Sequence, residues 1–250
     1  MGNAAPVRVR RRTILYLEPR PGTPLRTALD EFRSTSAHKW GPTDAHAYHP
    51  HCSVTGFWEH RPMNTLTNGI DGPNTEEQAA VALVELAINA HTKNCAADQQ
   101  AGTRLPPPTV LPPLIPPKKK SCLILPLKPP TEYTDLAKSI SHLFGDSNLF
   151  INRLQPKRCD HISLAYYSHD NVDGVPASPQ PSPAVLEQEG ECFREMRLYA
   201  DEVLAPLFAE GVDVGAGGWD LVYYDLVREE MEPRMGGEHE FKEIRRWPVA

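Results

Sequence analysis

The stretch His51-Cys52-Ser53-Val54-Thr55-Gly56-Phe57-Trp58 has a counterpart later in the chain, His161-Ile162-Ser163-Leu164-Ala165-Tyr166-Tyr167. Each places a histidine two residues before a serine, at the start of an apolar run that favours a β-strand. Because side chains alternate in a strand, residues i and i+2 share one face, so each stretch can direct an imidazole and a hydroxyl at one place. Two such pairs facing each other would suit a phosphodiester held between a general acid and a general base.

The same order of elements precedes both stretches. In the first half, a predicted strand at 13–17 leads to a helical stretch at about 24–34 and then to His51. In the second half, a predicted strand at 121–125 leads to a helical stretch at about 132–144 and then to His161. This agreement predicts an internal duplication, and a duplication changes the interpretation of the whole fold.

On these residues the chain resembles the 2H phosphoesterase superfamily, also called the LigT-like or cyclic phosphodiesterase fold. The resemblance extends from about Thr13 to Pro248 and rests on the two H-x-[ST]-x motifs. It implies an α+β, bilobed and duplicated fold, in which each lobe is an antiparallel sheet with helices on its outer face and the active cleft lies between the lobes. Serine in both motifs is closer to the branch that trims the 3′ ends of spliceosomal small nuclear RNA, because many cyclic phosphodiesterases carry threonine there.

The resemblance implies a metal-independent phosphodiesterase that hydrolyses the 2′,3′-cyclic phosphates of RNA ends or nucleotides, without a cofactor. Ser53 and Ser163 would bind the phosphate. His51 would be the general acid and His161 the general base, although the RNA-trimming relatives use the opposite order. Two alternatives stay open: a 3′-to-5′ exoribonuclease that trims small RNAs, and a non-catalytic nucleotide-binding scaffold of the same fold.

Aromatic and basic residues beside the motifs are candidates for substrate binding. Trp40 and Tyr48 precede the first motif, Trp58 ends it, and Tyr166 lies in the second. Aromatic rings at such places could stack on a base, and packing in the core is the competing interpretation. Arg158 is the candidate cation closest in sequence to His161.

Charge also limits the range of functions. The net charge of −6 argues against a protein that coats nucleic acid through a broad basic face, but a small cleft does not need one. The basic trio Arg153, Lys157 and Arg158 is the best candidate for attracting a polyanion toward the cleft.

A metal site in the first motif region is an alternative to the catalytic interpretation. It is the weaker of the two, because the spacings of the candidate ligands fit no standard zinc motif. The residues of that cluster are Asp44, His46, His49, His51 and Cys52.

The composition predicts four segments: a disordered basic arm at 1–12, a first lobe at 13–103, a proline-rich linker at 104–120 and a second lobe at 121–250. Many of the 26 prolines cluster in the linker, which favours polyproline II structure or disorder. A stiff connection is the favoured interpretation of the linker, and a docking site for a polyproline-binding partner is the alternative.

The remaining signals in the sequence predict further helices and strands and the cell compartment of the protein. Helices are expected at 75–94 and 183–208, with strands at 219–226 and 240–247. No apolar run is long enough to span a membrane, and the five cysteines form no C-x-x-C pair. We therefore expect a monomer in the cytoplasm or the nucleus, with reduced thiols and no membrane partner, that acts on an RNA 3′ end or a cyclic nucleotide.

Overall fold

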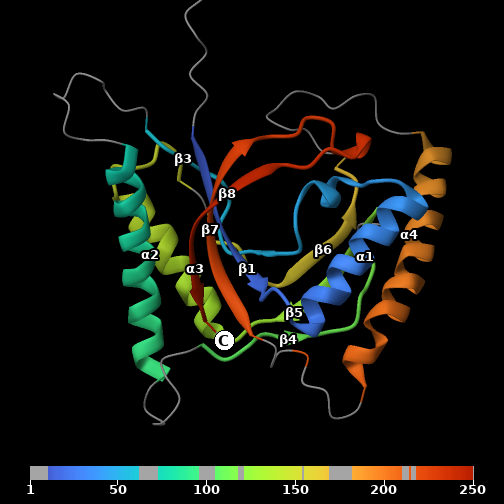
Figure 1. Ribbon diagram of the computed structural model, residues 1–250, viewed down its shortest axis with the longest axis horizontal. Helices are drawn as coiled ribbons and strands as arrows, with labels where there is room; N and C mark the ends of the chain where they lie inside the picture. The colour runs from blue at the N-terminus through green and yellow to red at the C-terminus, as the bar shows by residue number, and fades with distance from the viewer. Residues whose placement is uncertain are drawn as a thin grey trace, which may run out of the picture.

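Two antiparallel sheets lie at the centre of the molecule, with helices on either side (Figure 1). The computed structural model describes residues 11–61, 73–95, 105–117, 121–153, 155–168, 182–209, 214 and 218–249. The strands are β1 (Arg12–Pro19), β2 (Cys52–Ser53), β3 (Trp58–Glu59), β4 (Thr109–Val110), β5 (Cys122–Lys128), β6 (His161–Tyr166), β7 (Trp219–Arg228) and β8 (Glu240–Pro248). The helices are α1 (Pro24–Trp40), α2 (Pro73–Cys95), α3 (Thr131–Asp146) and α4 (Pro183–Leu204), with short 3-10 turns η1 (Asp44–Ala47), η2 (Ala205–Phe208) and η3 (Pro233–Met235).

The larger sheet has the strand order β2-β1-β7-β8, and β3 also pairs with β1. The smaller sheet has the order β4-β5-β6. The expected α+β architecture with antiparallel sheets is therefore confirmed. Most of the expected helices and strands form close to their predicted bounds, and the helix expected at 183–208 ends at Leu204 and continues as the 3-10 turn η2. Two differ: the helix expected at about 24–34 extends to Trp40, and the strand expected after His51 forms only as β2, with β3 as a separate short strand.

The duplicated order of elements is visible in the strand pairing. In the first unit, β1 leads through α1 to β2, and β2 returns to pair antiparallel with β1 so that Ser53 lies opposite Tyr16. In the second unit, β5 leads through α3 to β6, and Ser163 lies opposite Ile124. Each histidine–serine motif is therefore held by the first strand of its own unit.

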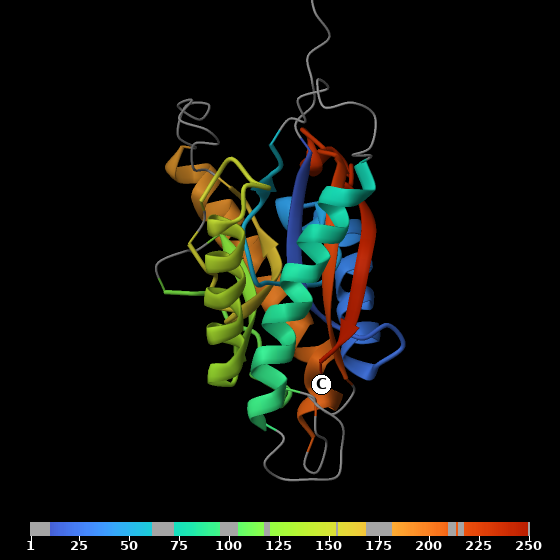
Figure 2. The ribbon, with the colours of Figure 1, turned by 90° about the vertical axis from the view of Figure 1, so that its left-hand side faces the viewer.

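Helices from the two halves of the chain pack in pairs. α1 packs against α4, and α2 packs against α3, so each pair joins one helix from each half. Figures 1 and 2 show the pairs on opposite sides of the sheets. One cluster of buried apolar side chains runs through both sheets and all four helices, including Leu15 of β1, Leu125 of β5 and Phe193 of α4. The two sheets thus share one hydrophobic core.

The expected division of the chain at 121 needs a correction. β7 and β8 belong to the larger sheet, where β7 pairs with β1 over the register from Arg12↔Leu226 to Pro19↔Trp219. The segment 121–250 is thus divided between the two sheets. The physical reason is that β7 is buried from Trp219 to Tyr224 and needs a partner on each side, which β1 and β8 supply.

The proline-rich segment is also more ordered than expected. Leu105 and Val110 are buried, β4 pairs with the edge of β5, and Leu114 forms an isolated bridge to Ile124. Proline is tolerated at a sheet edge because the missing N–H can face away from the partner strand. The described part of this linker, 105–117, therefore completes the smaller sheet.

Residues 11 and 12 of the predicted disordered arm are ordered. Arg12 begins β1, and Arg11 forms ion pairs with Glu77 of α2 and Asp225 of β7. Residues 1–10 lie outside the described part of the chain. Within the described residues, no helix is long and apolar enough to cross a membrane.

The position of β7 can be tested by truncating single side chains. Leu221 is fully buried on β7, whereas Val227 of the same strand is 51% exposed. We expect Leu221→Ala to lower the free energy of unfolding by about 2–5 kcal/mol, and Val227→Ala to change it by at most about 0.5 kcal/mol. Urea denaturation of both variants measures the difference, and equal small losses would contradict a central position for β7.

Candidate active site

The two histidine–serine motifs meet where β2 contacts β6. The backbone N–H of Lys157, in the loop before β6, donates a hydrogen bond of 3.3 Å to the Val54 carbonyl just after β2. The buried thiols of Cys52 and Cys159 contact each other next to the motifs, and this contact together with burial raises the pKa of Cys52. These links join the end of the first motif to the segment that leads into the second.

The His51 ring is fixed on one face and at one nitrogen. Its face stacks on the buried ring of Tyr16, with 3.7 Å between ring centroids and an interplanar angle of 30°. Its Nδ1 lies 2.8 Å from the backbone carbonyl oxygen of His49. A carbonyl only accepts hydrogen bonds, so Nδ1 carries the proton. In the neutral ring, Nε2 therefore keeps a free lone pair.

Burial strongly disfavours a charge on His51. Burial, reinforced by the nearby charge of His49, lowers the pKa of His51 to about 3. The ring is consequently neutral at neutral pH and can accept a proton at Nε2.

The second motif histidine has the opposite environment. The side chain of His161 is 45% exposed, and its Nδ1 lies 2.7 Å from Oδ1 of Asp160. The carboxylate accepts a hydrogen bond from Nδ1, which orients the ring and leaves Nε2 as the nitrogen that can exchange a proton with a ligand.

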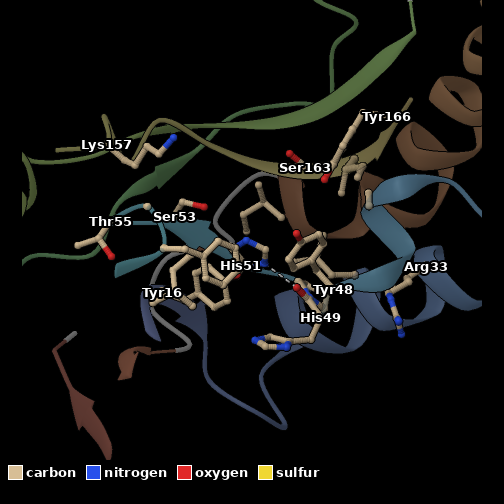
Figure 3. A pocket seen from close by; sticks show the side chains of 18 of the residues that line it. Tyr16, Arg33, Tyr48, His49, His51, Ser53, Thr55, Lys157, Ser163 and Tyr166 are labelled. Carbon is tan, nitrogen blue, oxygen red and sulfur yellow. Dashed lines mark hydrogen bonds between the residues drawn. The ribbon is translucent and has the colours of Figure 1, made fainter. Parts of the chain in front are cut away.

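Two cavities meet at the motifs. The first, of about 230 Å³, is lined mainly by aromatic and aliphatic side chains of β1, α1, η1 and β6. The second, of about 520 Å³, lies along the loop 155–161 and includes His161. Four residues line both cavities: His51, Ser53, Lys157 and Ser163. Figure 3 shows β2, which carries Ser53, facing β6, which carries Ser163.

Some of the predicted substrate-binding residues lie at this site. Tyr48 and Tyr166 line the first cavity. The Tyr48 ring centroid lies 5.5 Å from that of His51, and Figure 3 shows Tyr166 beside Ser163. Arg158 lines the second cavity. Of the basic trio, Arg153 lines neither cavity, because it lies earlier in the loop than the cavity wall that begins at 155.

The two predicted tryptophans do not line either cavity, and these expectations are corrected. Trp58 is fully buried in the core against Phe144 and Phe150. Trp40 lies at the end of α1 beside Tyr199 of α4, and its indole N–H donates to Glu195 at 2.9 Å. Packing in the core and between helices accounts for both rings.

Tyr16 was not predicted at the site, His49 was predicted only as a ligand of the rival metal cluster, and Lys157 only as one of the basic trio. Tyr16 and His49 fix the His51 ring, and Lys157 belongs to the small set that lines both cavities. The alternation His49, His51, Ser53 was the available signal, because residues two apart can share a face. Nothing in the sequence indicates that Tyr16 stacks on His51, since the contact depends on the pairing of β1 with β2.

The rival metal cluster is not assembled. The carboxylate of Asp44 binds Arg234 at 3.1 Å, and Nδ1 of His46 accepts a hydrogen bond from the Thr43 backbone N–H. Burial lowers the pKa of His46 to about 4. In the ranges that the structure describes, no group of three or more histidine, cysteine or acidic residues could hold a metal ion.

Comparisons with known proteins give little further information. No family model matches the chain, and no curated protein matches it. A solved structure described as a crystal structure of a phosphoesterase aligns with a TM-score of 0.40 and 13% sequence identity, over 97% of this chain and 99% of that chain. A similarity of this size supports no conclusion about activity.

The stacked tyrosine provides a test of the His51 environment. Removal of the ring in Tyr16→Ala admits water to the imidazole, so we expect the pKa of His51 to rise from about 3 toward its ordinary value of about 6.5. Tyr16→Phe keeps the stacked ring and should leave the pKa low. Titration of the ring nitrogens by ¹⁵N NMR measures both variants. Wild-type His51 that titrates near pH 6.5 would contradict the buried, neutral assignment.

Proposed function

We propose that this chain is a metal-independent phosphodiesterase that hydrolyses the 2′,3′-cyclic phosphates of RNA ends or nucleotides by histidine general acid–base catalysis. One observation carries the proposal: the imidazole and hydroxyl groups of two motifs far apart in the chain, one entering β2 and the other in β6, line a shared cavity. Acid–base hydrolysis of a phosphodiester needs one group to accept a proton from water and another to donate a proton to the leaving oxygen. Two imidazoles supply both groups.

In the proposed mechanism, His51 is the general base. Its neutral ring and free Nε2 suit it to take a proton from the attacking water. A bound phosphodiester anion beside the ring favours the charged imidazolium, so the ring becomes more basic when substrate is present. This assignment reverses the order implied by the cyclic phosphodiesterases and matches that of the RNA-trimming relatives.

His161 is then the general acid. As the water oxygen bonds to phosphorus, the bond to one ribose oxygen breaks, and that oxygen takes the proton from Nε2 of His161. The hydroxyls of Ser53 and Ser163 donate hydrogen bonds to the non-bridging oxygens, and the Lys157 ammonium offsets their negative charge. The product is a ribose phosphate monoester.

Substitution of the motif residues tests the reaction. With a 2′,3′-cyclic mononucleotide in the presence of a chelator, we expect wild-type turnover and a loss of at least about 100-fold in His51→Ala and in His161→Ala. Ser53→Ala and Ser163→Ala should each lose about 100- to 1,000-fold in kcat, because each removes one donor to the developing charge. Phosphate release from the monoester by a coupled phosphatase measures the rate.

The matched control is His142→Ala. His142 is an exposed histidine of α3 that pairs with Asp146 at 3.3 Å and lines neither cavity, so its variant should keep wild-type activity. Turnover that survives in either motif-histidine variant, or that disappears with the chelator, would contradict the proposed mechanism.

A second candidate function is 3′-to-5′ exoribonuclease activity on small RNAs. The observation that favours it is that two cavities adjoin at the shared residues His51, Ser53, Lys157 and Ser163. A phosphate at the junction could have one nucleoside in the aromatic cavity and the rest of an RNA strand along Arg158 and Lys157. A cyclic mononucleotide would occupy only one of the two cavities.

A comparison of substrates distinguishes the two functions. If the RNA strand follows the second cavity, Arg158→Ala should reduce kcat/KM on a uridylate-tailed oligonucleotide by about 10-fold. It should also reduce the slope of log(kcat/KM) against log[salt] by about one, while activity on a cyclic mononucleotide stays unchanged. Arg153→Ala removes an exposed cation of the same loop that lines neither cavity, and serves as the control. Equal effects of Arg158→Ala on both substrates would reject the strand path.

A further inference from the structure

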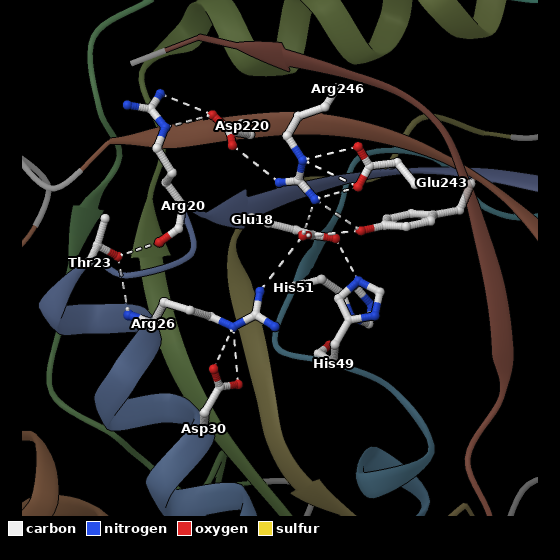
Figure 4. Close-up of polar contacts among 11 residues, drawn as sticks. Glu18, Arg20, Thr23, Arg26, Asp30, His49, His51, Asp220, Glu243 and Arg246 are labelled. Atoms are coloured by element: carbon white, nitrogen blue, oxygen red, sulfur yellow. Dashed lines mark hydrogen bonds and ion pairs between the residues drawn. The ribbon is translucent and has the colours of Figure 1, made fainter.

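A buried carboxylate lies close behind His51. The side chain of Glu18, near the end of β1, is 1% exposed and is surrounded by partners (Figure 4). Its Oε1 lies 2.5 Å from Nε2 of His49, and its Oε2 accepts a hydrogen bond from the Tyr224 hydroxyl at 3.3 Å. The guanidinium groups of Arg26 and Arg246 lie 3.8 and 3.7 Å from Oε2.

Glu18 is ionised within this network. Burial alone would raise the pKa of Glu18, but the hydrogen bond from His49 and the nearby charge of Arg246 hold it below its usual value. A buried carboxylate is costly unless it is paired, and here His49, Arg26 and Arg246 supply the partners. The contact that reaches toward the cavity is the one with His49.

His49 connects Glu18 to His51 through its own backbone. Its ring is held by Glu18, and its carbonyl oxygen accepts the hydrogen bond from Nδ1 of His51. The carbonyl belongs to the loop between η1 and β2, where the chain has no ladder hydrogen bonds of its own to fix it. Anchoring the His49 side chain therefore fixes the carbonyl that selects the His51 tautomer.

We propose that Glu18 and His49 form a positioning pair for His51, in which the buried carboxylate holds the His49 ring and the His49 carbonyl holds the His51 imidazole with Nε2 directed at the substrate. The arrangement differs from a direct carboxylate–histidine pair, because the link to the reacting ring passes through a backbone oxygen. Glu18 lines neither cavity, and His49 lines only the first.

The charge of His49 adds an electrostatic effect on His51. The groups that face His51 are Tyr16 and Glu18 of β1, Tyr48 and His49 of the loop before β2, Lys157 of the loop before β6, and His161 of β6. Among them, the charges of His49 and His161 disfavour a proton on His51, whereas Glu18 favours one. The two members of the pair therefore shift the pKa of His51 in opposite directions, although both help to hold its ring in place.

This opposition gives a test with two independent readouts. Glu18→Gln and His49→Phe should each reduce kcat by up to about 100-fold with little change in KM, because both release the carbonyl that orients the base. The double variant should be no slower than the slower single variant, since the two residues act as one unit. By ¹⁵N NMR, both single variants should show His51 as a mixture of tautomers in place of Nδ1–H alone. The pKa of His51 should rise only in His49→Phe.

The matched control is Asp220→Asn. Asp220 is as deeply buried as Glu18, at 2% exposure, and it bonds Arg246 and Arg20 in the same network without touching His49. Its substitution should lower the stability of the fold comparably and leave the tautomer and the titration of His51 unchanged. A conservative His49→Gln, which keeps a side-chain donor toward Glu18, should restore part of the lost kcat.

The inference rests on the proposed function only in treating His51 as the base. A wild-type protein that turns over no phosphodiester would reject the proposed function, and the NMR readouts would still decide the positioning role. Unchanged His51 tautomer and titration in both Glu18→Gln and His49→Phe would overturn the inference. An equal effect in Asp220→Asn would also overturn it, because it would reveal a general loss of packing.

Discussion

The contact between β2 and β6 is the constraint on which the site depends. It joins Val54 to Lys157 by a backbone hydrogen bond and presses two buried cysteine thiols together, across more than 100 residues of chain. β2 has only two residues and would not hold its place alone, but it pairs with β1, and β1 is buried along nearly its whole length against β7. The position of the first motif is thus secured by the most deeply buried strands of the molecule.

The same residue type has two different environments at this site. His51 is stacked on Tyr16 and kept neutral, whereas His161 is exposed beside Asp160. Pairs of titratable groups whose surroundings differ in this way can act as base and acid at one pH. The difference arises from position, because β2 lies on the larger sheet under the aromatic cluster of Tyr16 and Tyr224, and the start of β6 lies at the rim of the second cavity.

The buried charges behind the site are compensated locally. Glu18 and Asp220 are almost inaccessible, and Arg246 contacts both carboxylates, with Arg20 and Arg26 completing the set. Removing one partner from such a group costs more than the pair contributes, since the remaining charge stays buried. The network also joins β1 to β7 and β8, so the strands that carry the site and the charges that support it belong to one unit (Figure 4).

Local patterns in the sequence were sufficient for the elements and for part of the site. The apolar runs and the repeated order of strand, helix and histidine are local signals, so the duplication and the pairs His51–Ser53 and His161–Ser163 could be predicted. The same local signals misassigned Trp40 and Trp58, because the sequence pattern around an aromatic residue is the same whether its side chain faces a cavity or the core.

What the tertiary structure alone decided is which distant segments are neighbours. The insertion of β7 and β8 beside β1, the packing of each helix against one from the other half, and the pairing of the linker with β5 all depend on long-range burial of apolar faces. The placement of Tyr16, His49 and Glu18 around His51 follows from that assembly. The sequence by itself determined the chemical groups and their local spacing, since these are set by alternation within a strand. The fold determined the neutral state of His51 and the orientation of the site groups, since the partners that bury and hold each group come from parts of the chain that are far apart.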